Sequence, residues 1–122
     1  MTLAPETTDL KVQLRLDSED SENEVWFTVC DLNLLVPGRG VAALLPDGRQ
    51  VALFRDRSGS LYGIDNRDPF SGAAVLSRGL TGTHQGRPFV ASPLLKQRFD
   101  LVSGECLDDA SVRVATYEVR AG

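Results

Sequence analysis

Asn66-Arg67-Asp68-Pro69-Phe70-Ser71-Gly72-Ala73 and Ser92-Pro93-Leu94-Leu95-Lys96-Gln97-Arg98-Phe99-Asp100-Leu101 are the two stretches that decide the fold. The first is followed by Leu76-Ser77-Arg78-Gly79, and the second by Ser103-Gly104-Glu105-Cys106-Leu107. Both stretches are rich in Pro, Gly, Ser and Asp, which are the residues that turns require. We therefore expect two loops, and the chemistry of the chain depends on what these loops carry.

Short runs of β-branched and aromatic residues surround the two loops. We expect strands at Val25–Cys30, Val41–Leu45, Gln50–Arg55, Leu61–Asp65, Leu80–His84, Pro88–Ala91, Phe99–Leu101 and Val114–Arg120. Pro46-Asp47-Gly48-Arg49 predicts a hairpin between two of them, because Asp-Gly supplies the geometry of a tight turn. Only Asp31–Leu35 favours a helical turn. Many short strands at this spacing predict one all-β domain, an antiparallel sandwich or partly open barrel.

The N-terminal segment differs from the rest of the chain in charge. Residues 1–24 hold seven acids and two bases, a net charge of -5, whereas the whole chain carries -4, so the remainder sums to +1. We expect an acidic, flexible leader at 1–24 and the β domain at 25–120, because residues 17–24 contain no apolar side chain. Lys11–Leu16 alternates strictly, which leaves open an added edge strand or a tail.

Composition excludes several functions. A nearly neutral body does not favour a nucleic-acid partner. No apolar run approaches the 18 or more residues of a membrane span, and the opening residues lack the pattern of a secretory signal, so we expect a cytoplasmic protein. Cys30 and Cys106 belong to no CxxC motif; two reduced thiols fit the cytoplasm better than a disulfide, which the sequence leaves open.

Other polar residues favour structural roles. Asp68 beside Arg67 is interpreted as a turn interaction rather than a catalytic pair, because Asp before Pro commonly opens a turn. His84 lies in an expected hairpin tip and has no matched partner in the sequence. Three glycines are turn glycines rather than a phosphate cradle, since no helix or GKS/T element follows them: Gly79, Gly82 and Gly86. We expect no catalytic residue in this chain.

The two loops resemble the cluster-binding loops of Rieske proteins, C-P-H-x-G-A and C-P-x-H-G-x-x-F-D-L followed by a T-G turn. The resemblance runs from about Val25 to Val119. The residues in register are Pro69, Gly72, Ala73, Pro93, Phe99, Asp100, Leu101 and Gly104. It implies a Rieske-like fold for the β domain.

The four positions that would hold the iron ligands carry other residues. A Rieske [2Fe–2S] centre takes two thiolates and two imidazoles. Here the cysteine positions are Asp68 and Ser92, and the histidine positions are Phe70 and Leu95. Phe and Leu offer no lone pair, and a Ser hydroxyl with one carboxylate is a poor replacement for two thiolates. We expect no metal in this chain, and an apolar plug of Phe70, Leu94 and Leu95 turned inward in place of the cluster.

Among Rieske-like chains without ligands, the combination D-P-F-S-G-A-A-V-L-S-R-G, S-P-L-x-K-Q-x-F-D-L and G-x-C-L-D-D resembles the small subunit of assimilatory nitrite reductase. In that family a large subunit carries FAD, a [4Fe–4S] cluster and sirohaem, and it reduces nitrite to ammonium with NAD(P)H. The resemblance implies a non-catalytic accessory subunit in nitrate assimilation, which binds the large subunit and holds no cofactor of its own.

The loops also carry candidate partner-binding residues, because other Rieske proteins dock through them. The candidates are Arg67, Arg78, Leu94, Lys96 and Arg98. A second interpretation is equally open: these basic residues, together with Arg87, form a solvent-exposed rim that binds no partner. Two further functions stay open: a stand-alone Rieske-like adaptor that docks on another oxidoreductase, and a redox carrier whose cluster uses unexpected ligands.

Overall fold

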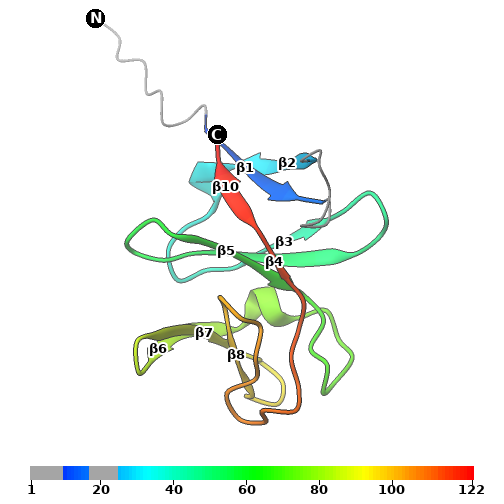
Figure 1. Ribbon diagram of the computed structural model, residues 1–122, viewed down its shortest axis with the longest axis vertical. Helices are drawn as coiled ribbons and strands as arrows, with labels where there is room; N and C mark the ends of the chain where they lie inside the picture. The colour runs from blue at the N-terminus through cyan, green and yellow to red at the C-terminus, as the bar shows by residue number, and fades with distance from the viewer. Residues whose placement is uncertain (1–9, 17–24) are drawn as a thin grey trace, which may run out of the picture.

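The computed structural model describes residues 10–16 and 25–122, which form three antiparallel sheets (Figure 1). The strands are β1 (Lys11–Arg15), β2 (Trp26–Asp31), β3 (Val41–Leu44), β4 (Gln50–Arg55), β5 (Leu61–Asp65), β6 (Leu80–His84), β7 (Arg87–Ala91), β8 (Arg98–Asp100), β9 (Thr116–Tyr117) and β10 (Val119–Ala121), with 3-10 turns η2 (Leu32–Leu34) and η3 (Leu76–Arg78). The sheet orders are β10-β1-β2, β3-β4-β5-β9 and β6-β7-β8. The expected all-β architecture is confirmed.

Strand β4 lies between two hydrophobic cores and is buried on both faces. Val51 and Leu53 enter the upper core, which lies between the first and second sheets. Ala52 and Phe54 enter the lower core, which lies between the second and third sheets. The division follows from the strand itself, because successive side chains point to opposite faces. β4 therefore joins the two halves of the molecule.

Strand β1 is the middle strand of the first sheet. Val12 and Leu14 pair with β10 on one side and β2 on the other, and both side chains are 0% exposed in the upper core. The alternating pattern correctly predicted a strand, but its place is central rather than at an edge. The first sheet therefore includes Lys11–Arg15, which lie within the segment predicted to be a leader. The flexible leader predicted for the rest of 1–24 lies outside the described residues, apart from Leu10 and Leu16, which flank β1.

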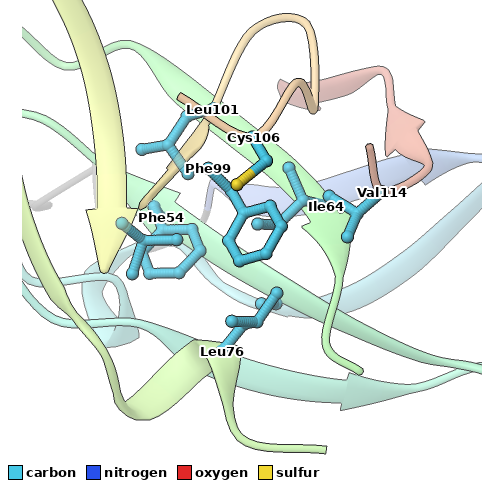
Figure 2. Close-up of a cluster of buried hydrophobic side chains, with 9 residues drawn as sticks. Phe54, Ile64, Leu76, Phe99, Leu101, Cys106 and Val114 are labelled. Atoms are coloured by element: carbon cyan, nitrogen blue, oxygen red, sulfur yellow. The ribbon is translucent and has the colours of Figure 1, made fainter. Parts of the chain in front are cut away.

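The lower core positions the two loops. Figure 2 shows Phe99 of β8 in the middle of this cluster, between Phe54, Ile64 and Leu76. Leu76 belongs to η3, so this core fixes the end of the first loop and the end of the second loop together. Complete burial of such a side chain contributes about 1.5–3 kcal/mol.

The C-terminal segment differs from the single closing strand that the sequence predicted. Strand β9 pairs with β5 in the second sheet, whereas β10 pairs with β1 in the first. Glu118 separates them, and Val114, expected at the start of the strand, is instead buried in the lower core. The last residues therefore cross from one sheet to the other.

Candidate functional site

The first loop (residues 66–79) folds around Asp68. Its N–H donates to the carbonyl of Ala73 at 2.8 Å, and its own carbonyl accepts from the N–H of Gly72 at 2.7 Å. Its side-chain Oδ1 accepts from the N–H of Phe70 at 2.8 Å, which is the turn interaction that Asp before Pro predicts. Gly72 has φ +79°, a left-handed conformation that glycine adopts without strain.

Asn66 closes this loop at its base, a role that was not predicted from the sequence. Its Oδ1 accepts from the N–H of Ser77 at 2.7 Å. Its Nδ2 donates to Gln50 Oε1 at 3.1 Å and to the Ala74 carbonyl at 3.3 Å. The only signal in the sequence is an asparagine directly after a strand, at the start of a loop.

The second loop (residues 92–97) is a tight turn closed on itself. The N–H of Ser92 donates to the Gln97 carbonyl at 2.9 Å, and the N–H of Lys96 donates to the Ser92 carbonyl at 3.1 Å. Lys96 has φ +69°, a left-handed conformation that is unusual for a residue with a Cβ. The turn leaves Leu94 52% and Leu95 50% exposed at its tip.

The two former cysteine positions are bonded to each other. The hydroxyl of Ser92 donates to Asp68 Oδ2 at 2.5 Å, and the two residues are 1% and 0% exposed. This contact joins the two loops directly, side chain to side chain. The loops are thus tied by a buried polar pair at the place where a cluster would tie them.

The two former histidine positions have separated. Phe70 lies against the lower core, with its ring centroid 6.2 Å from that of Phe99. Leu95 points to solvent together with Leu94, so the predicted inward-turned plug is wrong for both leucines. The short turn that Lys96 closes projects them outward, while Asp68 and Ser92 are bonded to each other between the loops.

The donor set does not fit a [2Fe–2S] cluster. Phe70 and Leu95 have no donor atom, and the oxygens of Asp68 and Ser92 are bonded to each other. Within residues 10–16 and 25–122, no group of three or more His, Cys, Asp or Glu side chains could hold a metal ion. These four positions therefore provide no ligand set for such a cluster.

The basic residues of the loops fall into two groups. Arg98 is held by Asp108, with Nη2 at 2.9 Å from Oδ1 and its backbone N–H at 2.8 Å from Oδ2. In the described part of the chain, no ion pair involves Arg67, Arg78 or Lys96, and all three are exposed. The unpaired positive charge of the loops therefore comes from these three residues.

The two cysteines are free and lie in different cores. Cys106 is buried in the lower core, and Cys30 packs against the upper core. Burial, and then the neighbouring charge of Asp31, raises the pKa of the Cys30 thiol above its ordinary value, so it stays protonated at neutral pH. Neither thiol has the features of a nucleophile.

A β domain that carries these two loops in this register defines a Rieske-like protein, here one without iron ligands at its four ligand positions. The model of the Rieske-like [2Fe-2S] domain family matches residues 25–122. Among the described residues, no helix is long and apolar enough to cross a membrane.

Similarity to individual proteins narrows this class. The chain is 48% identical to the nitrite reductase (NADH) small subunit of Salmonella typhimurium over 96 residues, which cover 78% of this chain and 88% of that one. The crystal structure of a chain described as an NADH-dependent nitrite reductase small subunit, from Mycobacterium tuberculosis, superposes with a TM-score of 0.76 at 56% identity, covering 79% of this chain and 85% of the other. The chain belongs to the family of nitrite reductase small subunits.

A third relative shows the same domain inside a larger polypeptide. The nitrite reductase [NAD(P)H] large subunit of Klebsiella oxytoca is 42% identical over 95 residues, which are 78% of this chain but 10% of that protein. A domain of this kind therefore occurs both as a separate small subunit and within a large subunit.

Proposed function

We propose that this chain is the accessory, non-catalytic subunit of a cytoplasmic NAD(P)H-dependent nitrite reductase, and that it binds the large catalytic subunit. The observation that carries this proposal is the Klebsiella oxytoca large subunit, in which a similar domain is part of the same polypeptide. Two units that are separate chains in one organism and one chain in another generally work in contact with each other.

The chemistry would belong to the large subunit. That partner would hold the FAD, the [4Fe–4S] cluster and the sirohaem, and would reduce nitrite to ammonium in nitrate assimilation. Its own cluster positions carry Asp68, Phe70, Ser92 and Leu95, which are not the thiolates and imidazoles of a [2Fe–2S] centre that exchanges electrons. Its contribution would be to bind and stabilise the partner.

The docking face that we propose is the tip of the two loops. Leu94 and Leu95 form an exposed apolar pair, which suits the central anchor of an interface. Arg67, Arg78 and Lys96 carry unpaired positive charge, which suits an acidic surface on the partner.

A stand-alone adaptor that docks on another oxidoreductase is the competing function. The same exposed leucines would serve such an adaptor. The occurrence of the domain within a nitrite reductase large subunit favours the subunit role over this alternative.

The test is a binding titration of this chain against the large subunit of the same organism. Leu95→Asp should weaken the complex about tenfold or more, because loss of a central anchor costs roughly 1–2 kcal/mol or more. Arg67→Glu with Lys96→Glu should slow association and flatten its dependence on salt. The matched control is Arg67→Lys with Lys96→Arg, which preserves both charges.

Arg98 is left unchanged in this design, because its bonds to Asp108 make it part of the fold. Absence of any complex with the large subunit would contradict the proposed function. A complex that all the loop variants form like the wild type would contradict the docking face alone.

A further inference from the structure

A hollow of about 600 Å3 runs along the free edge of the third sheet. Four consecutive residues of β6 line it, Leu80 to Thr83, and the turn between β4 and β5 lines the facing side. Pro88 of β7 and Leu101 line it as well, so the hollow extends from the edge of β6 over one face of the third sheet. Figure 1 shows β6 on the outside of its sheet, with the β4–β5 turn above it.

Two residues of β6 direct their backbone N–H and C=O groups away from β7. The β6–β7 hairpin closes through Gln85 and Gly86, with φ of +51° and +79°, which defines a two-residue turn flanked by a hydrogen-bonded pair. Hydrogen-bonded and non-hydrogen-bonded pairs alternate along an antiparallel ladder. The backbone N–H and C=O groups of Thr81 and Thr83 therefore face away from β7. Pro88, which lies opposite Thr83, has no N–H, and its carbonyl accepts from the N–H of Leu101 at 2.9 Å.

These outward groups are available. In the described part of the chain, no hydrogen bond reaches the backbone of Thr81 or Thr83 outside the β6–β7 pairing. Leu80 at the start of the strand is 78% exposed. An edge with free N–H and C=O groups beside an apolar side chain is a template for a further strand.

The opposite side of the hollow carries a net positive charge, because Arg55 and Arg57 stand against one carboxylate, Asp56. Asp56 is fully engaged within its own turn: its Oδ1 accepts from the N–H groups of Ser58 at 3.0 Å and Ser60 at 2.9 Å, and its Oδ2 from the Tyr62 hydroxyl at 2.8 Å. These bonds, above all the one from the Ser58 hydroxyl at 2.6 Å, hold the pKa of Asp56 below its ordinary value.

Arg55 and Arg57, which line the same side, make no ion pair among the described residues. Their charge is therefore free to attract an acidic group.

We propose that an extended acidic segment of the large subunit adds to the edge of β6 as a further strand, with its backbone bonded to Thr81 and Thr83 and its carboxylates facing Arg55 and Arg57. This inference rests on the proposed function, since it names a second contact with the same partner. Strand addition obtains affinity from main-chain hydrogen bonds and specificity from the alternate side chains. A second copy of this chain is a poorer occupant, because symmetric pairing of β6 would bring like-charged arginines of both copies together.

Amide hydrogen exchange of this chain, alone and in complex with the large subunit, tests the proposal. The Thr81 and Thr83 amides should exchange freely in the isolated chain and at least tenfold more slowly in the complex. Protection already present in the isolated chain, or its absence in the complex, would overturn the proposal.

Substitutions test it independently. Thr83→Pro removes the outward N–H while every hydrogen bond to β7 is kept, and it should weaken the complex about tenfold. Thr83→Val is the matched control, because it changes the side chain and keeps the N–H. Arg55→Glu with Arg57→Glu should weaken binding, whereas lysine at both positions should preserve it.

The failures of the two proposals are distinguishable. If no complex forms at all, the proposed function is wrong. If the complex forms and Thr83→Pro and the glutamate variant bind as the wild type does, strand addition is wrong and the subunit role stands.

Discussion

The first and second loops occupy equivalent places in the fold and have opposite surroundings. The first loop is built into the protein: Asp68 is buried, Phe70 lies on Phe99, and η3 places Leu76 in the lower core. The second loop is closed by its own backbone and exposes Leu94, Leu95 and Lys96. One loop therefore stabilises the fold, and the other presents a surface.

The contrast shows how a cluster-binding scaffold can persist without its cluster. A structural metal site can contribute on the order of 10 kcal/mol to folding, so its loss requires other interactions to hold the loops. Here the Asp68–Ser92 bond joins the loops, and the contact of Phe70 with the lower core fastens one of them. Beyond Ser92, the tip of the second loop exposes Leu94, Leu95 and Lys96, which leaves it available for contact with a partner.

The largest expected effect compares the same substitution in the two loops. Leu76→Ala removes a side chain that is 0% exposed and should lower the free energy of unfolding by about 2–5 kcal/mol. Leu95→Ala removes a half-exposed side chain and should change it by about 0.5 kcal/mol or less. Urea unfolding of the two variants measures the difference, and equal losses would contradict the division between the loops.

The bond between the loops should give the next largest effect. Ser92→Ala removes the donor to a buried carboxylate and should cost about 1.5–3 kcal/mol. A double-mutant cycle with Asp68→Ala isolates the pairwise part, which should be about 1–3 kcal/mol because the two side chains are in direct contact. A coupling energy near zero would mean that the loops are held by packing alone.

The sequence predicted most of the strands and the position of both loops. It did not predict that the first loop is buried and the tip of the second is exposed. Turn residues and alternation predicted the strands, and the register of Pro69, Gly72 and Phe99 predicted where the loops lie. Phe70 and Leu95 give the same signal, an apolar residue at a histidine position. Which one is buried depends on tertiary contacts: Phe70 reaches Phe99, whereas the left-handed turn at Lys96 directs Leu95 outward.

The same limit applies to β1. The alternation of Lys11–Leu16 predicted a strand with one apolar face, and Val12 and Leu14 are indeed buried. Its partner β10 lies about a hundred residues further along the chain, and no local pattern specifies such a pairing.

Low pH should lower the stability of the segment that follows the second loop. Burial works against the charge of Asp100, but the N–H groups of Ser103 and Val102 and the Arg87 guanidinium outweigh it and hold the Asp100 pKa below its ordinary value. This stabilisation is complete above the ordinary pKa of about 3.9 and is lost as the pH falls through the lowered value.

Asp100→Asn should therefore destabilise the protein at pH 7, by about 1 kcal/mol since its partner Arg87 is partly exposed. The difference from the wild type should shrink below pH 4. Urea unfolding at pH 7, 4 and 2.5 measures it, and a difference that is constant with pH would show that the charge of Asp100 contributes nothing.

The smallest expected effect separates stability from binding at the tip of the second loop. Lys96 holds φ +69°, which costs a residue with a Cβ about 1 kcal/mol and costs glycine little. Lys96→Gly should therefore raise the free energy of unfolding by about 0.5–1 kcal/mol, whereas Lys96→Ala, which keeps the Cβ, should leave it near the wild-type value.

Strained backbone conformations of this kind cluster at functional sites. Lys96→Gly and Lys96→Ala should accordingly weaken binding to the large subunit by the same factor, since both remove the ammonium group, and only one of them stabilises the fold. Thermal unfolding and the binding titration on the same two proteins measure both quantities. A glycine variant that is more stable and binds as tightly as the wild type would leave Lys96 without a role in docking, and would assign the contact at this tip to Leu94 and Leu95 alone.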